Sequence, residues 1–128
     1  MLLCPSLMCA DYGNLRATVE DLDAAGIDIF HCDVMDGSFV PNFAMGLEDI
    51  KAELFASAGA DIIYIHPESE RYVVKTLAAI KSLGKSAGIA VNPDTSISEI
   101  EEMLNLCDYV MVMTVNPGFA GQSFIEFT

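Results

Sequence analysis

A histidine and a carboxylate stand two residues apart in an apolar part of the sequence. His31 and Asp33 flank Cys32, within residues 27–34, which we expect to form a strand. Because side chains alternate along a strand, His31 and Asp33 share one face and Cys32 lies on the other. A converging imidazole and carboxylate suit a divalent metal ion, and they equally suit a hydrogen-bonded pair in a core. The spacing alone leaves both interpretations open.

Three other features carry groups suited to holding a small ligand. Ser6 ends the first expected strand, although a serine there more often caps a helix or turn. His66 ends a run rich in isoleucine, and it fits a ligand contact and a structural histidine equally well. The third feature is a loop after the last expected strand, where mostly small side chains let backbone amides approach a phosphate. Its residues are Gly118, Phe119, Ala120 and Gly121.

The net charge limits the classes of partner. The chain has 19 acidic and 6 basic residues and a formal charge of -13 at pH 7. This charge repels phosphate backbones and anionic lipid surfaces, so we expect neither nucleic acid nor a membrane as a partner. An anionic ligand would have to be held by backbone amides or by a metal ion.

Apolar runs and cysteines give no sign of secretion. No apolar run approaches the roughly 20 residues that span a bilayer, and the first residues lack the basic flank of a signal peptide. The 4 cysteines have no metal-type spacing. We expect reduced thiols, with Cys32 as a small core residue, in a cytoplasmic protein.

The elements that must position these groups alternate between strand and helix. Short apolar runs predict strands over residues 2–6, 27–34, 61–66, 86–91 and 109–115. Apolar residues at helical spacing predict helices over residues 14–25, 47–58, 72–83 and 98–106. Ser98 and Glu101 have the spacing of a capping box, and residues 36–46 have the composition of a loop.

Apolar strands that each lead into a helix predict parallel pairing and an α/β fold. An open doubly wound sheet and part of a closed eight-stranded barrel both satisfy this pattern. A barrel of roughly 250 residues uses about 31 residues for each strand and helix, so 128 residues provide about four such units. The chain therefore cannot close a barrel alone, and we expect one domain over residues 1–128.

Three segments carry a family resemblance. They are CPSLMCAD at residues 4–11, HCDVMDGSFVPN at residues 31–42 and MTVNPGFAGQ at residues 113–122. In this order they resemble the ribulose-phosphate 3-epimerase family, and the resemblance extends over essentially the whole chain. The first of these segments, His66-Pro67-Glu68 and the loop at residues 118–121 are also similar to the allulose-6-phosphate 3-epimerase branch of that family.

The resemblance implies a fold and a reaction. The fold would be a TIM barrel of the ribulose-phosphate-binding type, of which residues 1–128 hold about five of eight strands as a single incomplete (β/α) barrel domain. The reaction would be metal-dependent 3-epimerisation of a phosphorylated ketose, which interconverts ribulose 5-phosphate and xylulose 5-phosphate. The alternative substrate is allulose 6-phosphate. In either case a proton leaves one face and returns to the other through an enediolate.

The same resemblance assigns roles to the candidate residues. Asp33 would be one catalytic base and, with His31, a ligand of one divalent ion of zinc, manganese, iron or cobalt. Ser6, His66 and the loop at residues 118–121 would contact the phosphorylated ketose.

The chain departs from the family pattern at two places. A third strand is missing between Lys51 and Glu53, and the family's last two strands would follow Thr128. Those strands would carry the second base and the other metal ligands. An inactive fragment that only assembles with other chains and a phosphosugar-binding module therefore stay open as alternatives. Uncovered strand edges predict self-association into a homo-oligomer.

A polypeptide of 13.8 kDa is expected not to epimerise such a substrate. The loss of a base or metal ligand commonly lowers a rate by several powers of ten, so Asp33 and His31 alone should leave little activity. Intact-mass measurement combined with deuterium exchange at the substrate carbon checks this expectation. A mass of 13.8 kDa with fast exchange that Asp33→Asn abolishes would contradict it.

Overall fold

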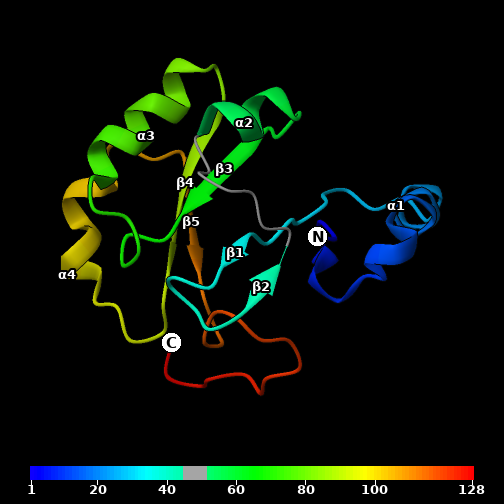
Figure 1. Cartoon of the computed structure of the whole chain (residues 1–128). Coiled ribbons are helices and arrows are strands. Elements are labelled where there is room, and N and C mark those ends of the chain that lie inside the picture. Colours follow the sequence, from blue (N-terminus) through cyan, green and yellow to red (C-terminus); the bar gives the residue numbers. More distant parts are fainter. Residues whose placement is uncertain (45–51) are drawn as a thin grey trace. The chain divides into compact units, whose positions relative to one another are not determined.

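The computed structural model describes residues 1–44 and 52–128, and the chain divides into two compact units, residues 1–47 and 48–128 (Figure 1). Each unit has its own pairing of extended segments. The expectation of one domain over residues 1–128 stays a prediction.

In the first unit, helix α1 (Leu15–Ala24) confirms the helix predicted over residues 14–25. It follows a 3-10 turn at Tyr12–Asn14, in which the Asp11 side chain accepts a hydrogen bond from the backbone N–H of Gly13. The helix is amphipathic, but none of its residues is buried. It ends before Gly26, whose φ of 77° lies in the left-handed region that glycine adopts without strain.

The strands predicted over residues 2–6 and 27–34 are wrong as regular strands. The two segments do run side by side in parallel, because Ile29 N donates to Leu3 O at 3.2 Å and His31 N donates to Pro5 O at 3.1 Å. Only one isolated bridge forms, between Ser6 and His31. Pro5 explains the interruption, since it lacks the N–H that the intervening rung of a parallel ladder needs.

A short hairpin forms in the region predicted as a loop. Strand β1 (Met35–Asp36) pairs antiparallel with β2 (Phe43–Ala44). Gly37 turns the chain at a φ of 82°, and a Cβ at this position would lie 2.6 Å from the Phe43 ring. This residue therefore has to be glycine for both conformational and steric reasons. The rest of the predicted loop and the start of the helix predicted over 47–58 fall within residues 45–51, outside the described residues.

The second unit contains a parallel three-stranded sheet in the order β3-β4-β5. Its strands are β3 (Ile62–Ile65), β4 (Ser86–Val91) and β5 (Tyr109–Val112). They confirm the strands predicted over residues 61–66 and 86–91, and the last one ends three residues before the predicted end at 115. The chain is thus α/β with parallel pairing, and the carboxyl ends of all three strands meet at one edge.

Three helices accompany this sheet: α2 (Ala52–Ser57), α3 (Val73–Ser82) and α4 (Ile97–Ile100), the last continued by a 3-10 turn at Glu101–Met103. The predicted capping box at Ser98 and Glu101 is wrong. The helix begins earlier, and Ser96 and Glu99, which have the same spacing, make the reciprocal capping contacts. The sequence thus contains two overlapping capping-box patterns, and only the backbone shows which of them caps the helix.

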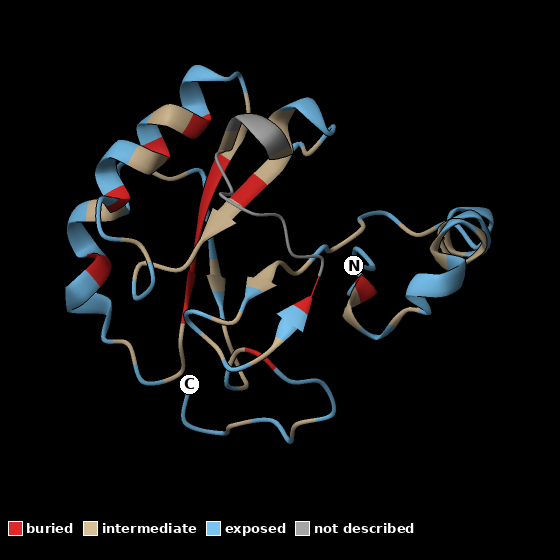
Figure 2. Cartoon of the chain, viewed as in Figure 1, coloured by how far each residue is buried: buried red, intermediate tan, exposed pale blue. Residues whose placement is uncertain are grey.

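Burial concentrates where α3 covers β4 (Figure 2). Leu77 and Ile80 of α3 are 1% and 0% exposed, and Ile89 of β4 is 0% exposed. Every residue of β4 after Ser86 is buried, including Gly88, where an added Cβ would lie 2.4 Å from the Tyr64 ring. Strand β4 is therefore covered on both faces, as expected of the central strand of a parallel sheet.

None of the helices in the described part of the chain combines the length and the apolar character needed to cross a membrane.

Replacing Leu77 by alanine is expected to lower the free energy of unfolding by about 2 to 5 kcal/mol, because the side chain is fully buried and leaves a cavity. Val74→Ala on the same helix is the matched control, since Val74 is 58% exposed and should change stability by less than about 0.5 kcal/mol. Urea denaturation measures both values. Equal effects of the two substitutions would contradict the packing of α3 on β4.

Candidate functional site

Three of the predicted site residues meet in the first unit. The parallel bridge places Ser6 beside His31, and the alternation along residues 31–33 places Asp33 on the same side as His31. The Ser6 hydroxyl donates to Asp33 Oδ2 at 2.5 Å, and His31 Nε2 lies 3.1 Å from Asp33 Oδ1. Each carboxylate oxygen therefore has its own partner, and the carboxylate is held from two sides.

Ser6 caps a turn and also contacts Asp33, while its predicted contact with a ligand stays a prediction. Its Oγ accepts a hydrogen bond from Met8 N at 3.1 Å and so caps the short 3-10 turn at Leu7–Cys9. The same hydroxyl donates its proton to Asp33. A single serine can do both, because a hydroxyl has one donor and two acceptor positions.

The electrostatics of this cluster centre on Asp33. The hydrogen bond to Asp33 raises the pKa of His31 above its usual range, although burial acts in the opposite direction, and the charge of Asp33 adds to the increase. Desolvation, followed by the charge of Asp33, raises the pKa of the Cys32 thiol. The expectation that Cys32 is a core residue is wrong, because it is exposed. The isolated pairing around His31 leaves this segment too thinly covered to bury a side chain on its far face.

The donor types at this cluster suit a divalent metal ion, but their number is small. His31 and Asp33 provide an imidazole and a carboxylate, as zinc and manganese sites do. Across residues 1–44 and 52–128, no group of three or more histidine, cysteine or acidic side chains is arranged to hold a metal ion. A pair of ligands alone holds a metal ion weakly, so the described residues form at most part of a metal site.

The other predicted site residues lie in the second unit, at the edge where the parallel strands end. His66 follows β3, and its Nδ1 lies 3.6 Å from Glu68 Oε2. Glu68 Oε1 accepts hydrogen bonds from the backbone N–H of Asn92 at 2.9 Å and from the hydroxyl of Thr95. Both donors belong to the segment after β4, so Glu68 ties the ends of two strands together.

Burial and hydrogen bonding act in opposite directions on Glu68. Burial raises the pKa of this carboxyl, but the hydrogen bonds from Asn92 and Thr95, together with the nearby His66, outweigh it and hold the pKa below its usual range. Glu68 is therefore a carboxylate at neutral pH. Glu68 was not among the predicted site residues, although it stands two residues after His66 in the sequence.

The predicted phosphate loop follows β5 at the same edge of the sheet. Gly118 and Gly121 have φ values of 107° and 73°, which a residue with a side chain would adopt only under strain. The side-chain amide of Gln122 donates to Asn116 O at 2.6 Å and to Phe119 O at 2.8 Å, which closes the loop from inside. Gln122 was not among the predicted site residues either. Its adjacency to Gly121 was the available signal.

The predicted site residues thus fall into two groups. Ser6, His31 and Asp33 contact one another in the first unit, and His66 and the loop at residues 118–121 share an edge of the sheet in the second.

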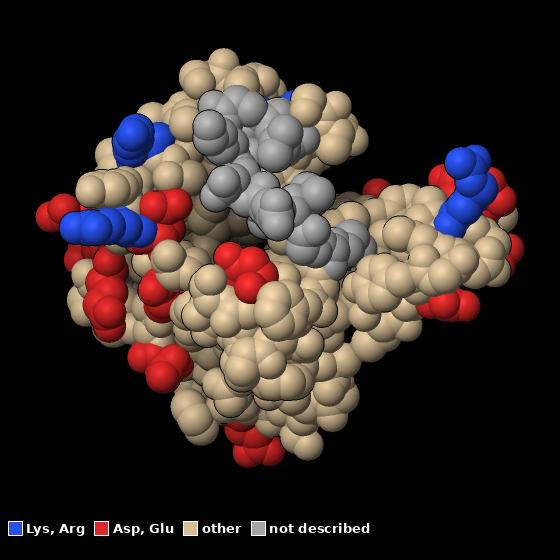
Figure 3. Space-filling view, viewed as in Figure 1, with Lys and Arg blue, Asp and Glu red and all other residues tan. Residues whose placement is uncertain are grey.

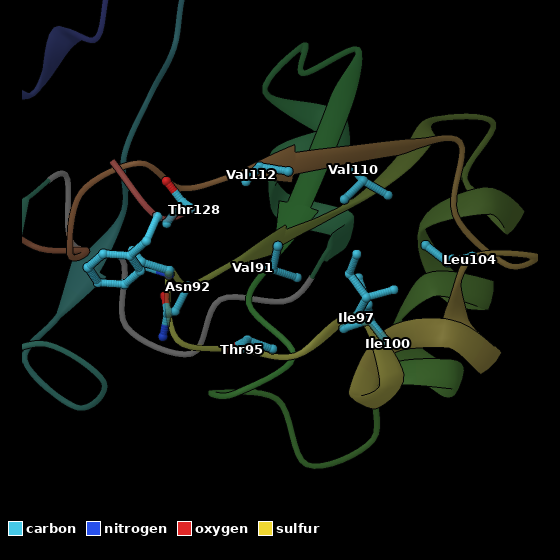
Figure 4. Close-up of a pocket in the computed structure, with 11 residues that line it drawn as sticks. Val91, Asn92, Thr95, Ile97, Ile100, Leu104, Val110, Val112 and Thr128 are labelled. Carbon is cyan, nitrogen blue, oxygen red and sulfur yellow. The ribbon is translucent and has the colours of Figure 1, made fainter. Parts of the chain in front are cut away.

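A groove of about 540 Å³ lies elsewhere in the second unit, between α4 and β5. Figure 4 shows Ile97 and Ile100 of α4 facing Val110 and Val112 of β5 across it. Its lining is mostly apolar, and none of the predicted site residues contributes to it. Because its lining residues include no acidic, basic or histidine side chain, we do not assign the chemistry to this groove.

Acidic side chains lie at several places on the face that Figure 3 shows, and few basic ones accompany them. With a formal charge of -13, the surrounding field opposes the approach of an anion. A phosphate would therefore have to rely on short-range backbone donors such as those of the loop at residues 118–121.

Comparison with known proteins places these groups in a family context. The sequence profile of the ribulose-phosphate 3 epimerase family matches residues 2–52 and 48–128. The ribulose-phosphate 3-epimerase of Aquifex aeolicus is 42% identical over 147 residues, which cover 98% of this chain and 66% of the relative. The one from Synechocystis sp. is 39% identical over 98% of this chain and 65% of the relative. The one from Escherichia coli K12 is 37% identical over 99% of this chain and 67% of the relative.

The chain spans about two thirds of the length of these relatives. The two matched stretches overlap at residues 48–52, and the alignment to the Aquifex protein covers 147 positions against 128 residues in this chain. The match to the family divides where we expect a strand of the family to be missing, between Lys51 and Glu53.

Replacing Gln122 by glutamate is expected to open the loop, because a carboxylate cannot donate to the carbonyl oxygens of Asn116 and Phe119. Loss of two hydrogen bonds costs about 1 to 3 kcal/mol, so exchange of the Ile125 amide, which donates to Thr114 O across the loop base, should accelerate by a factor of roughly 5 to 150. Hydrogen exchange followed by NMR measures this rate. Ser123→Ala, at the exposed neighbouring position, should leave it unchanged. Equal rates in all three proteins would rule out this role of Gln122.

Proposed function

The chain belongs to the ribulose-phosphate 3-epimerase family, and we propose that it acts in the 3-epimerisation of ribulose 5-phosphate to xylulose 5-phosphate, with Asp33 as one catalytic base. The family has the TIM-barrel fold, in which active sites lie at the carboxyl ends of the strands. His66 and the loop at residues 118–121 lie at that end of the parallel sheet, which supports the proposal.

The arrangement of Asp33 is the observation that carries this function. Epimerisation needs a carboxylate that takes the proton from C3 of the ketose, while the electron pair of the C–H bond moves toward C2 to form an enediolate. Contacts with Ser6 and His31 hold the Asp33 carboxylate in one orientation before substrate binds. A pre-oriented base of this kind suits abstraction of a weakly acidic proton.

A divalent ion of zinc, manganese, iron or cobalt is part of the proposal. His31 and Asp33 would be two of its ligands, and the ion would supply positive charge that stabilises negative charge on the sugar oxygens. His31 also keeps the carboxylate of Asp33 in place when no ion is bound, through the contact between Nε2 and Oδ1.

The phosphate of the substrate would bind at residues 118–121. Backbone N–H groups are neutral donors that need no cationic side chain, which suits a chain with 6 basic residues among 128. His66 would contact the sugar from the neighbouring strand end. We propose the pentulose as first substrate because the relatives named above are ribulose-phosphate 3-epimerases, with allulose 6-phosphate as the alternative.

A phosphosugar-binding module is the second candidate. It is favoured by the ligand count, since the described residues supply only His31 and Asp33 toward a metal ion. Such a module would keep the phosphate loop and bind ribulose 5-phosphate without transferring a proton.

Deuterium incorporation at C3 of ribulose 5-phosphate in D₂O, followed by proton NMR with added Mn²⁺ or Zn²⁺, tests the proposal. Asp33→Asn should lower the rate by about 10² to 10⁴, because the amide cannot accept the proton. The matched control is Asp36→Asn, which removes an exposed carboxylate three residues away and should retain the rate.

Equal losses in both variants would show that charge, and not the base, matters, and would contradict the role of Asp33. Binding of ribulose 5-phosphate without deuterium incorporation would support the binding module. Faster incorporation into allulose 6-phosphate would reverse the order of the two substrates.

A further inference from the structure

Strand β5 forms an exposed edge of the parallel sheet. It pairs with β4 on one side, and among residues 1–44 and 52–128 no strand pairs with its other side. Tyr109, Val110 and Val112 are 48%, 42% and 59% exposed, whereas the other edge strand, β3, has no exposed residue. An edge strand presents backbone N–H and C=O groups on which another strand can pair. Burial therefore indicates β5, and not β3, as the edge available to a partner.

The groove between α4 and β5 extends this apolar surface. Val110 and Val112 point into it from β5, and Ile97 faces them from α4 (Figure 4). Ile97 is 75% exposed, and Phe127, which also lines the groove, is 84% exposed. Together with Tyr109, these side chains expose roughly 450 Å² of apolar surface. A stable interface takes about 800 Å² from each partner, a little over half of it apolar, so this surface is large enough for one.

The distribution of charge restricts what can cover this surface. Neither the lining of the groove nor β5 carries an acidic, basic or histidine side chain. A basic partner would be drawn to acidic side chains elsewhere on the chain, and an acidic partner would find no cation here. The surface therefore suits an uncharged, apolar strand. A second copy of the chain supplies such a strand in its own β5, and it does so without bringing like charges face to face.

Antiparallel pairing of two β5 strands is self-consistent in its geometry. A two-fold axis through Met111 places Val110 of each copy opposite Val112 of the other, and directly opposite residues of an antiparallel pair lie on the same face. Both valines line the groove, so β-branched side chains meet on the groove face of both copies. A register shifted by one residue would set each valine opposite a residue of the other face, so the pattern of side chains selects the register through Met111.

We propose that two copies of this chain associate through antiparallel pairing of their β5 strands, with Val110, Val112 and Ile97 of each copy buried at the contact. The product is a continuous six-stranded sheet, with three strands from each copy. This inference assigns a surface to the homo-oligomer that the uncovered strand edges predict. It does not depend on the proposed epimerisation.

Sedimentation equilibrium of the 128-residue chain at several concentrations tests the association. The unsubstituted protein should show a reversible equilibrium between monomer and dimer. Val112→Lys should raise the dissociation constant of the dimer by at least about tenfold, because the two-fold axis brings the two lysines to diagonal positions across the paired strands. A monomer at every accessible concentration of the unsubstituted protein would overturn the proposal.

Val74→Lys is the matched control. Val74 lies on α3 and is 58% exposed, nearly the same as Val112, and the substitution changes the net charge by the same amount. Its effect on long-range repulsion between two copies is therefore the same, and only its position differs. The dissociation constant of this variant should equal that of the unsubstituted protein. Equal dissociation constants for Val112→Lys and Val74→Lys would show that the copies meet through another surface, which contradicts the proposal.

Hydrogen exchange of the unsubstituted protein, followed by NMR at low and high concentration, tests the strand pairing without any variant having to fold. The β5 amides that do not donate to β4 should exchange rapidly in the monomer and slowly in the dimer, because pairing gives them an acceptor. Slow exchange of these amides in the monomer would show that another part of the same chain covers the edge. Rapid exchange in the dimer would show that the copies meet elsewhere. Either result would overturn the proposal.

Discussion

Parallel pairing of β4 with β3 and β5 is the constraint on which the second unit depends. This strand is hydrogen-bonded on both sides and buried on both faces, and α3 packs Leu77 and Ile80 against it. Parallel pairing brings the carboxyl ends of the three strands to one edge, so His66, Asn92 and the loop after β5 meet there because of the register. The proposed substrate contacts follow from the same hydrophobic packing that stabilises the unit.

Carboxylates also serve as hydrogen-bond acceptors that connect distant segments of this acidic chain. Among the described residues, four carboxylates join segments that are distant in sequence by accepting backbone or hydroxyl hydrogen bonds: Asp28 from Leu3 N, Asp33 from Ser6 Oγ, Glu68 from Asn92 N and Asp108 from Ala87 N. Asp108 also pairs with Lys81 at 2.9 Å, and the hydrogen bond from Ala87 followed by this contact holds the pKa of Asp108 below its usual range. With 6 basic residues for 19 acidic ones, most carboxylates cannot have a lysine or arginine partner of their own.

The proposed site also depends on hydrogen-bond donors at fixed positions. Asp33 is oriented by a hydroxyl and an imidazole, and the phosphate would be held by backbone amides of a loop that Gln122 closes. Each of these interactions depends on a donor at a fixed place and not on a surplus of positive charge. The reaction is proposed from membership of the ribulose-phosphate 3-epimerase family, and the contacts of Asp33 and Gln122 support that proposal.

Hydrophobic periodicity predicted α1, α3, β3 and β4 almost to the residue, because α1 and α3 are amphipathic and β3 and β4 are short apolar runs. The side-by-side placement of His31 and Asp33 also followed from sequence, since alternation along an extended chain is local geometry. Tertiary structure decided the rest. The break in strand pairing at Pro5 depends on the neighbouring segment, since only pairing with that segment calls for the N–H that proline lacks. The start of α4 depends on whether Ser96 or Ser98 caps the helix. The contacts of Glu68 and Gln122 join atoms that only folding brings within hydrogen-bond distance, so the sequence marked these residues by their positions beside His66 and Gly121 but not by their partners.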